Sequence, residues 1–326
     1  MKVSSAMIHR ELRLRGRLIR LLLPCFTEKR LRHCDRLLRR VLRGRWLGKQ
    51  TVMEEISLPR QDGSSLRLCL CRSRAGVRSH AAGLLWLHGG GYAMGLPEQD
   101  FSFIDLLAGD GACVALLPDY RLSTSAPFPA ALEDCYAALL WMKKNASRLG
   151  IRPDQLFVGG ESAGGGLAAA LCLYARDHGQ VSVAFQMPLY PMLDCRNATA
   201  SAIDNNAPAW NAASNEAAWR LYLGDSAPSI YSAPALAQDL ANMPPLCTYV
   251  GTIDPFHDET AAYVSAMASE EIAVHFREYP GCFHGFDILC PGSSPARQAA
   301  AFLSDSFQWA LAHCFAPQPP SPSKKG

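Results

Sequence analysis

The chain has 326 residues, of which 49% are hydrophobic and 19% are charged, and its formal net charge at pH 7 is +3. This length and apolar content predict a folded chain with a substantial core, built as one large α/β domain or two smaller ones. They exclude disorder as the main state of the chain. No apolar run is long enough to predict a transmembrane helix.

Positive charge is concentrated near the N-terminus. Residues 10–45 carry twelve arginines and one lysine against three acidic residues, so this segment has a net charge of +10 and the remainder has −7. We expect no nucleic-acid binding, because no aromatic residues alternate with the arginines and the acidic body repels phosphate. The first interpretation is a solvated helix face, and the alternative is weak contact between the basic N-terminal helices and a membrane surface.

The twelve cysteines are scattered along the chain. They form no Cys-x-x-Cys pair, and strand alternation would place Cys69 and Cys71 on one face of a strand. This usage predicts reduced thiols in a cytoplasmic protein, without a disulfide framework or a zinc site. A secretory signal peptide is not expected, because the first apolar run is interrupted by Arg20.

Helices are predicted at the start of the chain, up to about residue 48. The clearest pattern there has apolar residues at helical spacing and arginines on the opposite side, which is typical of an amphipathic helix. The apolar positions are Leu31, Cys34, Leu38, Val41 and Leu42, and the arginines are Arg32, Arg36, Arg39 and Arg43.

Past these helices, strands alternate with helices. We predict strands over residues 52–58, 65–71, 83–87, 112–117, 155–159, 181–187, 246–250 and 274–279, and helices over residues 101–107, 130–149 and 210–223. The middle strands are almost continuously apolar, which indicates a parallel sheet covered by helices on both faces. Residues 191–244 interrupt the alternation and are expected to lie over the sheet. The Pro/Ser-rich tail, residues 316–326, is expected to be disordered.

A candidate nucleophile stands where the fifth predicted strand meets a helix. The segment Gly160-Glu161-Ser162-Ala163-Gly164 follows an apolar strand and precedes a Leu/Ala-rich helix. A Gly-x-Ser-x-Gly motif at this place is typical of a nucleophile elbow, whose glycines allow the tight turn that raises the serine hydroxyl above the sheet. The alternative is a glycine-rich turn that only packs closely or binds phosphate.

A second glycine-rich motif, His88-Gly89-Gly90-Gly91, ends the third predicted strand. Successive glycines leave backbone N–H groups free to point at an anion, so this loop and the Ala163 N–H together predict an oxyanion hole. A phosphate-binding loop is the alternative, but no Lys or Arg follows in the loop and the Gly-x-Gly-x-x-Gly spacing is absent. We interpret His88 as a structural residue that holds the loop.

A serine nucleophile needs a base and an acid that orients the base. His284 lies in a glycine-flanked loop after the last predicted strand and is the candidate base. Asp254 follows the strand at 246–250 and completes the chain order Ser, Asp, His. Asp254 precedes a proline, so it can instead be a helix N-cap. Asp258 is the fallback acid, although it is expected one turn up the following helix.

Together these motifs make the chain resemble the hormone-sensitive-lipase-like branch (family IV) of the α/β-hydrolases. Between residues 84 and 286 the resemblance also rests on Pro118-Asp119-Tyr120-Arg121-Leu122, Ala126-Pro127-Phe128-Pro129-Ala130, Pro244-Pro245, Asp258-Glu259 and Phe283-His284-Gly285-Phe286. The chain departs from the family pattern at three places. Glu161 replaces the usual Asp before the nucleophile, Gly166 replaces an Asn, and residues 123–125 replace a Pro-Glu pair.

The resemblance implies an α/β-hydrolase fold, with a mostly parallel central sheet of about eight strands, helices on both faces and a helical cap. One domain is implied for the whole chain, 1–326. Its N-terminal cap helices would be residues 1–48, its catalytic core residues 49–190 and 245–315, and its second cap segment residues 191–244.

The resemblance also implies a serine esterase or lipase that needs no metal and no cofactor. Ser162 would be the nucleophile, His284 the base and Asp254 its orienting acid. The implied oxyanion hole consists of Gly89, Gly90, Gly91 and Ala163, and His88 and Glu161 would support the loop.

The expected reaction is hydrolysis of short- to medium-chain carboxylic esters through an acyl-enzyme intermediate. Two alternatives stay open. One is a non-catalytic small-molecule receptor with the same fold, and the other is hydrolysis of an amide, formamide or lactone. The family often pairs through its last strand, so the segment 274–279 predicts a homodimer by analogy.

Overall fold

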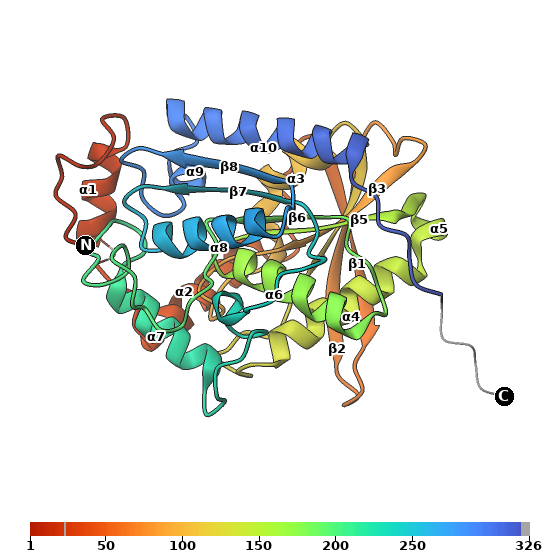
Figure 1. The fold of residues 1–326 in the computed structure, drawn as a ribbon, viewed down its shortest axis with the longest axis horizontal. Helices are drawn as coiled ribbons and strands as arrows, with labels where there is room; N and C mark the ends of the chain where they lie inside the picture. The colour runs from red at the N-terminus through yellow and green to blue at the C-terminus, as the bar shows by residue number, and fades with distance from the viewer. Residues whose placement is uncertain (23, 321–326) are drawn as a thin grey trace.

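The computed structural model describes residues 1–22 and 24–320. One eight-stranded sheet forms its centre, with strand order β1-β2-β4-β3-β5-β6-β7-β8 (Figure 1). β2 pairs antiparallel with β1 and with β4, and every later pair is parallel, so the sheet is mostly parallel as predicted. The strands are β1 (Thr51–Pro59), β2 (Ser65–Ser73), β3 (Ala81–Leu87), β4 (Cys113–Pro118), β5 (Ile151–Glu161), β6 (Phe185–Leu189), β7 (Leu246–Gly251) and β8 (Val274–Tyr279).

Helices cover both faces of this sheet, with α4, α6 and α8 on one face and α3 and α10 on the other. The α-helices are α1 (Arg13–Leu22), α2 (Glu28–Leu42), α3 (Phe101–Ala108), α4 (Ala130–Lys144), α5 (Ala146–Leu149), α6 (Ala163–His178), α7 (Ala212–Leu223), α8 (His257–Ser269), α9 (Phe286–Leu289) and α10 (Ser294–His313). Two short 3-10 helices, η1 (Pro97–Asp100) and η2 (Pro234–Leu236), complete the set. Within the described residues, no helix combines the length and the apolar character that crossing a bilayer requires.

Strand alternation divides the interior into two cores. Along β2, Leu68 and Leu70 belong to the core beneath α4 and α6, whereas Cys69 and Cys71 belong to the opposite core. Cys69 and Cys71 therefore share one face of the strand, as predicted. Burial raises the pKa of the Cys69 thiol to about 12, so this thiol stays protonated and unreactive at neutral pH.

The predicted strands agree with the observed ones to within two residues at each end, except at β5 and β6. For β5 we predicted residues 155–159, whereas the strand spans Ile151–Glu161. We predicted residues 181–187, whereas β6 spans Phe185–Leu189. Val181 is buried in the core from a loop position, and the Ala184 N–H donates to the Leu156 carbonyl at 2.8 Å before the ladder begins. Because Val181 is apolar although it lies in a loop, the predicted strand begins too early in the sequence. Ala316 and Gln318, in the tail expected to be disordered, donate hydrogen bonds to the core, and residues 321–326 lie outside the described residues.

Helices α1, α2 and α7 lie together on the left of Figure 1, and we call them the cap. The Phe26 N–H, in the segment between α1 and α2, donates to Ser214 of α7 at 2.8 Å. A Cβ on Gly16 of α1 would lie 3.0 Å from the Phe283 ring, which belongs to the loop after β8. The cap is therefore built from two separate stretches of chain and covers the carboxyl ends of the parallel strands.

Arg39 of α2 points toward the body, so the prediction that it lies on a solvated arginine face is wrong. Its guanidinium forms ion pairs with Asp35 at 3.1 Å and with Asp119 at 3.0 Å, and it donates to the Gly95 carbonyl at 3.0 Å. Helical spacing could not reveal this, because Asp119 lies 80 positions away in the sequence. Val41, predicted on the apolar side of the helix, is 48% exposed, whereas the side of α2 that faces the body carries Asp35 and Arg39 beside the buried Leu31.

We expect Arg39→Gln to lower the free energy of unfolding by about 1–3 kcal/mol, because it removes charged hydrogen bonds to two carboxylates and a carbonyl. Arg36→Gln, on the exposed side of the same helix, is the control and should change that free energy by less than about 0.5 kcal/mol. Urea unfolding of the two variants measures both effects. Equal stability of the two variants would contradict a structural role for Arg39.

Candidate active site

Ser162, His284 and Asp254 come together at the carboxyl ends of three strands. The Ser162 Oγ lies 2.8 Å from Nε2 of His284, and Nδ1 of His284 lies 2.8 Å from Oδ2 of Asp254. Ser162 directly follows β5, and His284 and Asp254 lie in the loops after β8 and β7. The exposed fractions of Ser162, His284 and Asp254 are 7%, 7% and 1%. Because the carboxylate accepts the Nδ1 proton, Nε2 is left free to accept the proton of the serine hydroxyl.

The backbone at Ser162 has the conformation of a sharp strand-to-helix turn. Its φ is 59° and its ψ is −119°, a combination that non-glycine residues rarely adopt. A Cβ on Gly160 or on Gly164 would overlap the Leu87 carbonyl oxygen. Glycine is therefore required on both sides of the serine, which is the physical reason for the Gly-x-Ser-x-Gly spacing.

Asp254, and not Asp258, is the acid that contacts the histidine. The second carboxylate oxygen of Asp254, Oδ1, accepts from the Phe256 N–H at 2.9 Å, so this residue also tightens the turn before α8. Asp258 lies on α8 and binds elsewhere, with His257 at 2.8 Å and the Ser201 N–H at 2.7 Å. The alternative that Asp254 is a helix N-cap is wrong, because α8 begins at His257 and its N-cap residue is Phe256.

The loop after β3 presents backbone N–H groups beside the serine. Within the described residues, the N–H groups of Gly90, Gly91 and Ala163 have no hydrogen-bond acceptor. Ala163 is the first residue of α6, where the helix dipole favours negative charge. Gly90 and Gly91 have φ values of 118° and 60°, which glycine adopts without strain. These three groups have the character of oxyanion donors.

Gly89 does not belong to this set, although we predicted it there. Its single N–H donates to Oε1 of Glu161 at 2.6 Å, so no proton is left for an oxyanion. Four candidate donors were predicted from the motifs, because nothing in the local sequence shows that the Glu161 carboxylate, 72 positions away, accepts the hydrogen bond of one of them. The role of Gly89 is to attach the loop to the residue before the nucleophile.

His88 and Tyr120 support the same loop from the core. Their rings stack with centroids 4.2 Å apart, and the Tyr120 hydroxyl donates to the His88 carbonyl at 2.6 Å. Nδ1 of His88 lies 2.9 Å from the Gly89 carbonyl. Burial lowers the pKa of His88 to about 4, so its ring is neutral at physiological pH and donates to that carbonyl.

Two buried carboxyl groups lie under the oxyanion loop. One is Glu161, and the other is Asp100 at the end of η1, whose carboxyl accepts from Nε1 of Trp86 at 3.0 Å. Burial raises the pKa of Asp100 to about 7. Burial also raises the pKa of Glu161, and the nearby Asp100 charge raises it further. The pair therefore retains a proton at neutral pH. No sequence motif indicated Asp100.

We expect Asp100→Asn to stabilise the protein increasingly as the pH rises. In the wild type the unfolded chain loses the Asp100 proton near its ordinary pKa of 3.8, whereas the folded chain keeps it to about 7. The wild-type free energy of unfolding therefore falls between pH 5 and pH 8, by about 2 kcal/mol from this group. Urea unfolding of both proteins at the two pH values measures the difference. The exposed Asp305→Asn is the control, and an equal pH dependence of all three proteins would contradict the prediction.

Aromatic side chains cover the triad. Trp210, from the segment before α7, has its ring centroid 6.3 Å from that of His284, and Phe26 stacks on Trp210 at 5.6 Å. Phe256 and Tyr190 meet the His284 ring edge-on at 5.0 and 5.1 Å. This cover is largely apolar and leaves only 7% of Ser162 and of His284 exposed. The sequence placed the two cap stretches but could not name these residues, since their contacts join distant segments.

The departure at Gly166 has a local explanation. A Cβ at this position would overlap the Tyr92 hydroxyl and the Met192 carbonyl. Tyr92 donates to that carbonyl at 3.0 Å, and this bond attaches the oxyanion loop to the segment after β6. Glycine at 166 thus leaves room for a contact that an asparagine would displace.

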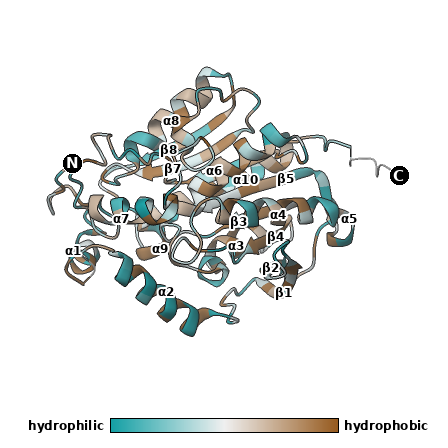
Figure 2. Cartoon of the chain, turned by 90° about the horizontal axis from the view of Figure 1, so that it is seen from below, coloured by the Kyte–Doolittle hydropathy of each residue, from teal (hydrophilic) through white to brown (hydrophobic). Residues whose placement is uncertain are grey.

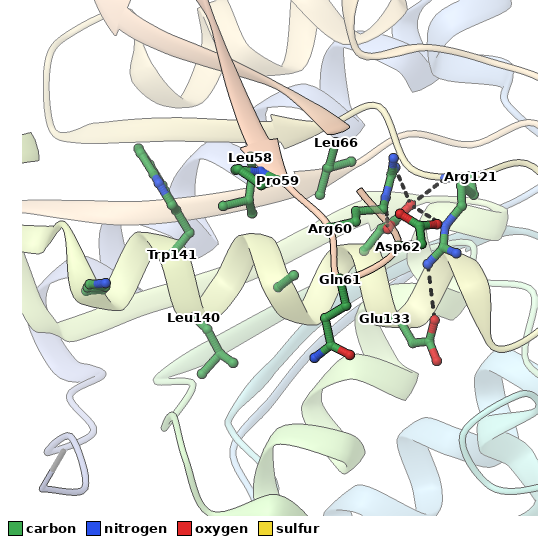
Figure 3. Close-up of a pocket in the computed structure, with 13 residues that line it drawn as sticks. Leu58, Pro59, Arg60, Gln61, Asp62, Leu66, Arg121, Glu133, Leu140 and Trp141 are labelled. Carbon is green, nitrogen blue, oxygen red and sulfur yellow. Dashed lines mark hydrogen bonds and ion pairs between the residues drawn. The ribbon is translucent and has the colours of Figure 1, made fainter. Parts of the chain in front are cut away.

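A groove of about 630 Å³ lies elsewhere, between the β1–β2 hairpin and α4 (Figure 3). Leu58, Leu66 and Trp141 form its apolar wall. Its two arginines, Arg60 and Arg121, are both paired with the buried Asp134, at 2.7 and 3.1 Å. No residue of the triad lines this groove, and its charges are already compensated, so we assign no reaction to it.

Comparison with known proteins supports the α/β-hydrolase fold. A family model described as "alpha/beta hydrolase fold" matches residues 84–288. The esterase LipI of Mycobacterium tuberculosis is 31% identical over 222 residues, which cover 64% of this chain and 67% of LipI. The carboxylic ester hydrolase LipN of the same organism is 34% identical over 214 residues, covering 62% of this chain and 56% of LipN.

Solved structures extend the similarity over almost the whole chain. A bacterial heroin esterase has a TM-score of 0.85 and 30% identity, over 95% of this chain and 99% of that one. The esterase LipW from Mycobacterium marinum has a TM-score of 0.80 and 27% identity, over 94% of this chain and 97% of that one. The chain belongs to the hormone-sensitive-lipase-like branch of the α/β-hydrolase family.

Proposed function

We propose that this protein is a serine carboxylesterase that hydrolyses short- to medium-chain carboxylic esters through an acyl-enzyme intermediate. The observation that carries the proposal is the unbroken line of hydrogen bonds from Ser162 through His284 to Asp254. At the serine end of this line, the N–H groups of Gly90, Gly91 and Ala163 have no acceptor within the described residues. The relatives named as esterases and carboxylic ester hydrolases support it.

In the first half-reaction, Ser162 Oγ attacks the ester carbonyl while its proton passes to Nε2 of His284. The negative charge that develops on the carbonyl oxygen is stabilised by the N–H groups of Gly90, Gly91 and Ala163. The bond to the alcohol then breaks, and His284 returns the proton to the departing alcohol oxygen. The product of this step is an acyl ester on Ser162.

In the second half-reaction, water replaces the alcohol. His284 takes a proton from the water molecule as its oxygen attacks the acyl carbon, and the same N–H groups stabilise the oxyanion. The bond to Oγ breaks, the proton passes from His284 to Ser162, and the carboxylic acid leaves. Asp254 accepts the hydrogen bond from Nδ1 of His284 and stabilises the charged imidazole in both halves. No step uses a metal or an organic cofactor.

The test is an activity profile on 4-nitrophenyl esters of increasing acyl length, paired with labelling by an organophosphonate. We expect the highest kcat/KM among the short and medium acyl chains and one phosphonate adduct on the peptide that contains Ser162. Turnover of amides or lactones in preference to all esters would contradict the ester assignment. Binding of esters without turnover and without an adduct would favour the receptor alternative.

Two further predictions concern the oligomeric state of the enzyme and its location in the cell. β8 is the edge strand of the sheet, paired with β7 alone among the described strands, and we propose that it forms the contact of a homodimer. We also propose a cytoplasmic location, from the cysteine usage. Sedimentation velocity tests the first proposal, and fractionation of the source cells tests the second.

A further inference from the structure

Helix α1 carries an exposed apolar face. Leu14, Leu18, Leu21 and Leu22 are 80%, 54%, 77% and 67% exposed. Their spacing places them on one side of the helix. The opposite side already packs on the body through the buried Gly16. The fold therefore leaves most of the apolar surface of these four leucines in contact with water, which is energetically unfavourable.

Helix α1 lies close to the triad through its buried side. Gly16 packs against Phe283, the residue before His284, and Arg15 donates to the Leu289 carbonyl of α9 at 3.2 Å. Leu289 and its neighbour Ile288 are themselves 41% and 43% exposed. The apolar surface therefore continues from α1 onto the short helix that follows the catalytic loop.

Exposed arginines surround the leucines. Arg10 and Arg17 are exposed beside them, and α2 presents further exposed arginines at 36 and 40 together with Leu37. Among the described residues, the only arginines of segment 10–45 with a carboxylate partner are Arg32 and Arg39. The remaining positive charge is uncompensated. Figure 2 shows α1 and α2 following each other along the lower left edge of the molecule, each with hydrophilic and hydrophobic positions.

We propose that α1, together with the exposed side of α2, binds an anionic lipid surface. A helix binds such a surface when its leucines enter the lipid interface and its arginines pair with lipid phosphates. Helix α1 carries both kinds of residue. A nucleic acid would satisfy the arginines but leave the leucines in water. The surface of the lipid would then lie against the cap, beside the catalytic loop.

Because the lipid surface would lie beside the catalytic loop, we infer a substrate class for the active site: esters dissolved in that lipid surface. That second inference rests on the proposed function, whereas the binding does not. Binding and hydrolysis are therefore measured separately, so that a failure of one is distinguishable from a failure of the other.

The binding experiment uses the full-length protein and two kinds of vesicle, phosphatidylcholine alone and an equimolar mixture of phosphatidylcholine and phosphatidylglycerol. We expect the wild type to co-sediment with the mixed vesicles and not with phosphatidylcholine, and to dissociate as salt is raised. Arg10→Gln/Arg17→Gln should lower the partition coefficient by about 30-fold, since each of the two basic residues near the surface contributes about fivefold. Leu18→Ser/Leu21→Ser should lower it by about tenfold or more.

Matched variants away from the cap provide the controls. Arg74→Gln/Lys144→Gln removes two other exposed charges, and Val52→Ser/Leu106→Ser removes two other exposed apolar side chains. Neither should change the partition coefficient, and all four variants should retain wild-type turnover of a soluble ester. The proposal is overturned if the wild type does not bind the mixed vesicles at low salt, or if the control variants lose as much binding as the α1 variants.

A second copy of the chain is the competing occupant of this face. If the wild type sediments as a dimer that Leu18→Ser/Leu21→Ser converts to a monomer, the leucines form a protein interface and the lipid proposal is wrong. If the wild type binds the mixed vesicles but hydrolyses no ester in them or in solution, the docking stands and the proposed function fails. If it hydrolyses soluble esters but not vesicle esters while bound, the substrate class is wrong.

Discussion

Ser162→Ala is expected to lower kcat for a soluble 4-nitrophenyl ester by about 10⁵- to 10⁶-fold. The reason is that no other nucleophile occupies the position 2.8 Å from Nε2 of His284. The oxyanion donors and the substrate contacts remain, so the residual rate should still exceed that of the uncatalysed reaction by about 10³-fold. Steady-state kinetics at high enzyme concentration measures this residual rate.

The control for this prediction is Ser269→Ala, an exposed serine on α8, which should retain wild-type kcat. Mass spectrometry after organophosphonate treatment gives an independent readout, since the adduct should be lost in Ser162→Ala alone. Activity within tenfold of the wild type in the Ser162 variant, with its adduct intact, would remove Ser162 from the mechanism.

Asp254→Asn should lower kcat by about 10⁴-fold. An amide in place of Oδ2 would donate to Nδ1 of His284, which forces the ring proton onto Nε2. That nitrogen could then no longer accept the proton of Ser162. The Asn side chain can still accept from the Phe256 N–H through its carbonyl oxygen, so the turn before α8 is expected to persist and the loss should lie in kcat.

Asp258→Asn is the matched control, because Asp258 lies four residues further on, in α8, and binds His257 and Ser201 instead of the triad. We expect a change of less than about threefold in kcat, within the range of a surface substitution. Similar losses in both variants would mean that the acid of the triad cannot be assigned from this geometry. A large loss in Asp258→Asn alone would reverse the assignment.

The sheet could be predicted from sequence because its strands are short, apolar and separated by helical patterns. The strand-end motifs could be placed for the same reason: the carboxyl ends of parallel strands share one edge, so Ser162, Asp254 and His284 meet there once their strands are recognised. Local spacing is sufficient for these features, since each motif requires only its own strand and turn.

Contacts between distant segments could not be predicted in the same way. Arg39 was assigned to solvent because helical periodicity carries no information about Asp119, and Gly89 was assigned to the oxyanion hole because nothing local shows that Glu161 occupies its N–H. The pairing of Phe26 with Trp210 likewise joins the two cap stretches only in three dimensions. Polar partners and cap contacts of this kind are decided by the fold as a whole.

The hydrogen bonds between α2 and Gly95 couple the position of the cap to that of the oxyanion loop. Asp35 accepts from the Gly95 N–H and Arg39 donates to the Gly95 carbonyl, so both backbone groups of this residue are held by the helix. Gly95 in turn lies against the His88 ring, within the loop whose amides face the nucleophile. A displacement of α2 would therefore disturb the oxyanion donors, and the cap helix takes part in setting the catalytic geometry as well as in covering the site.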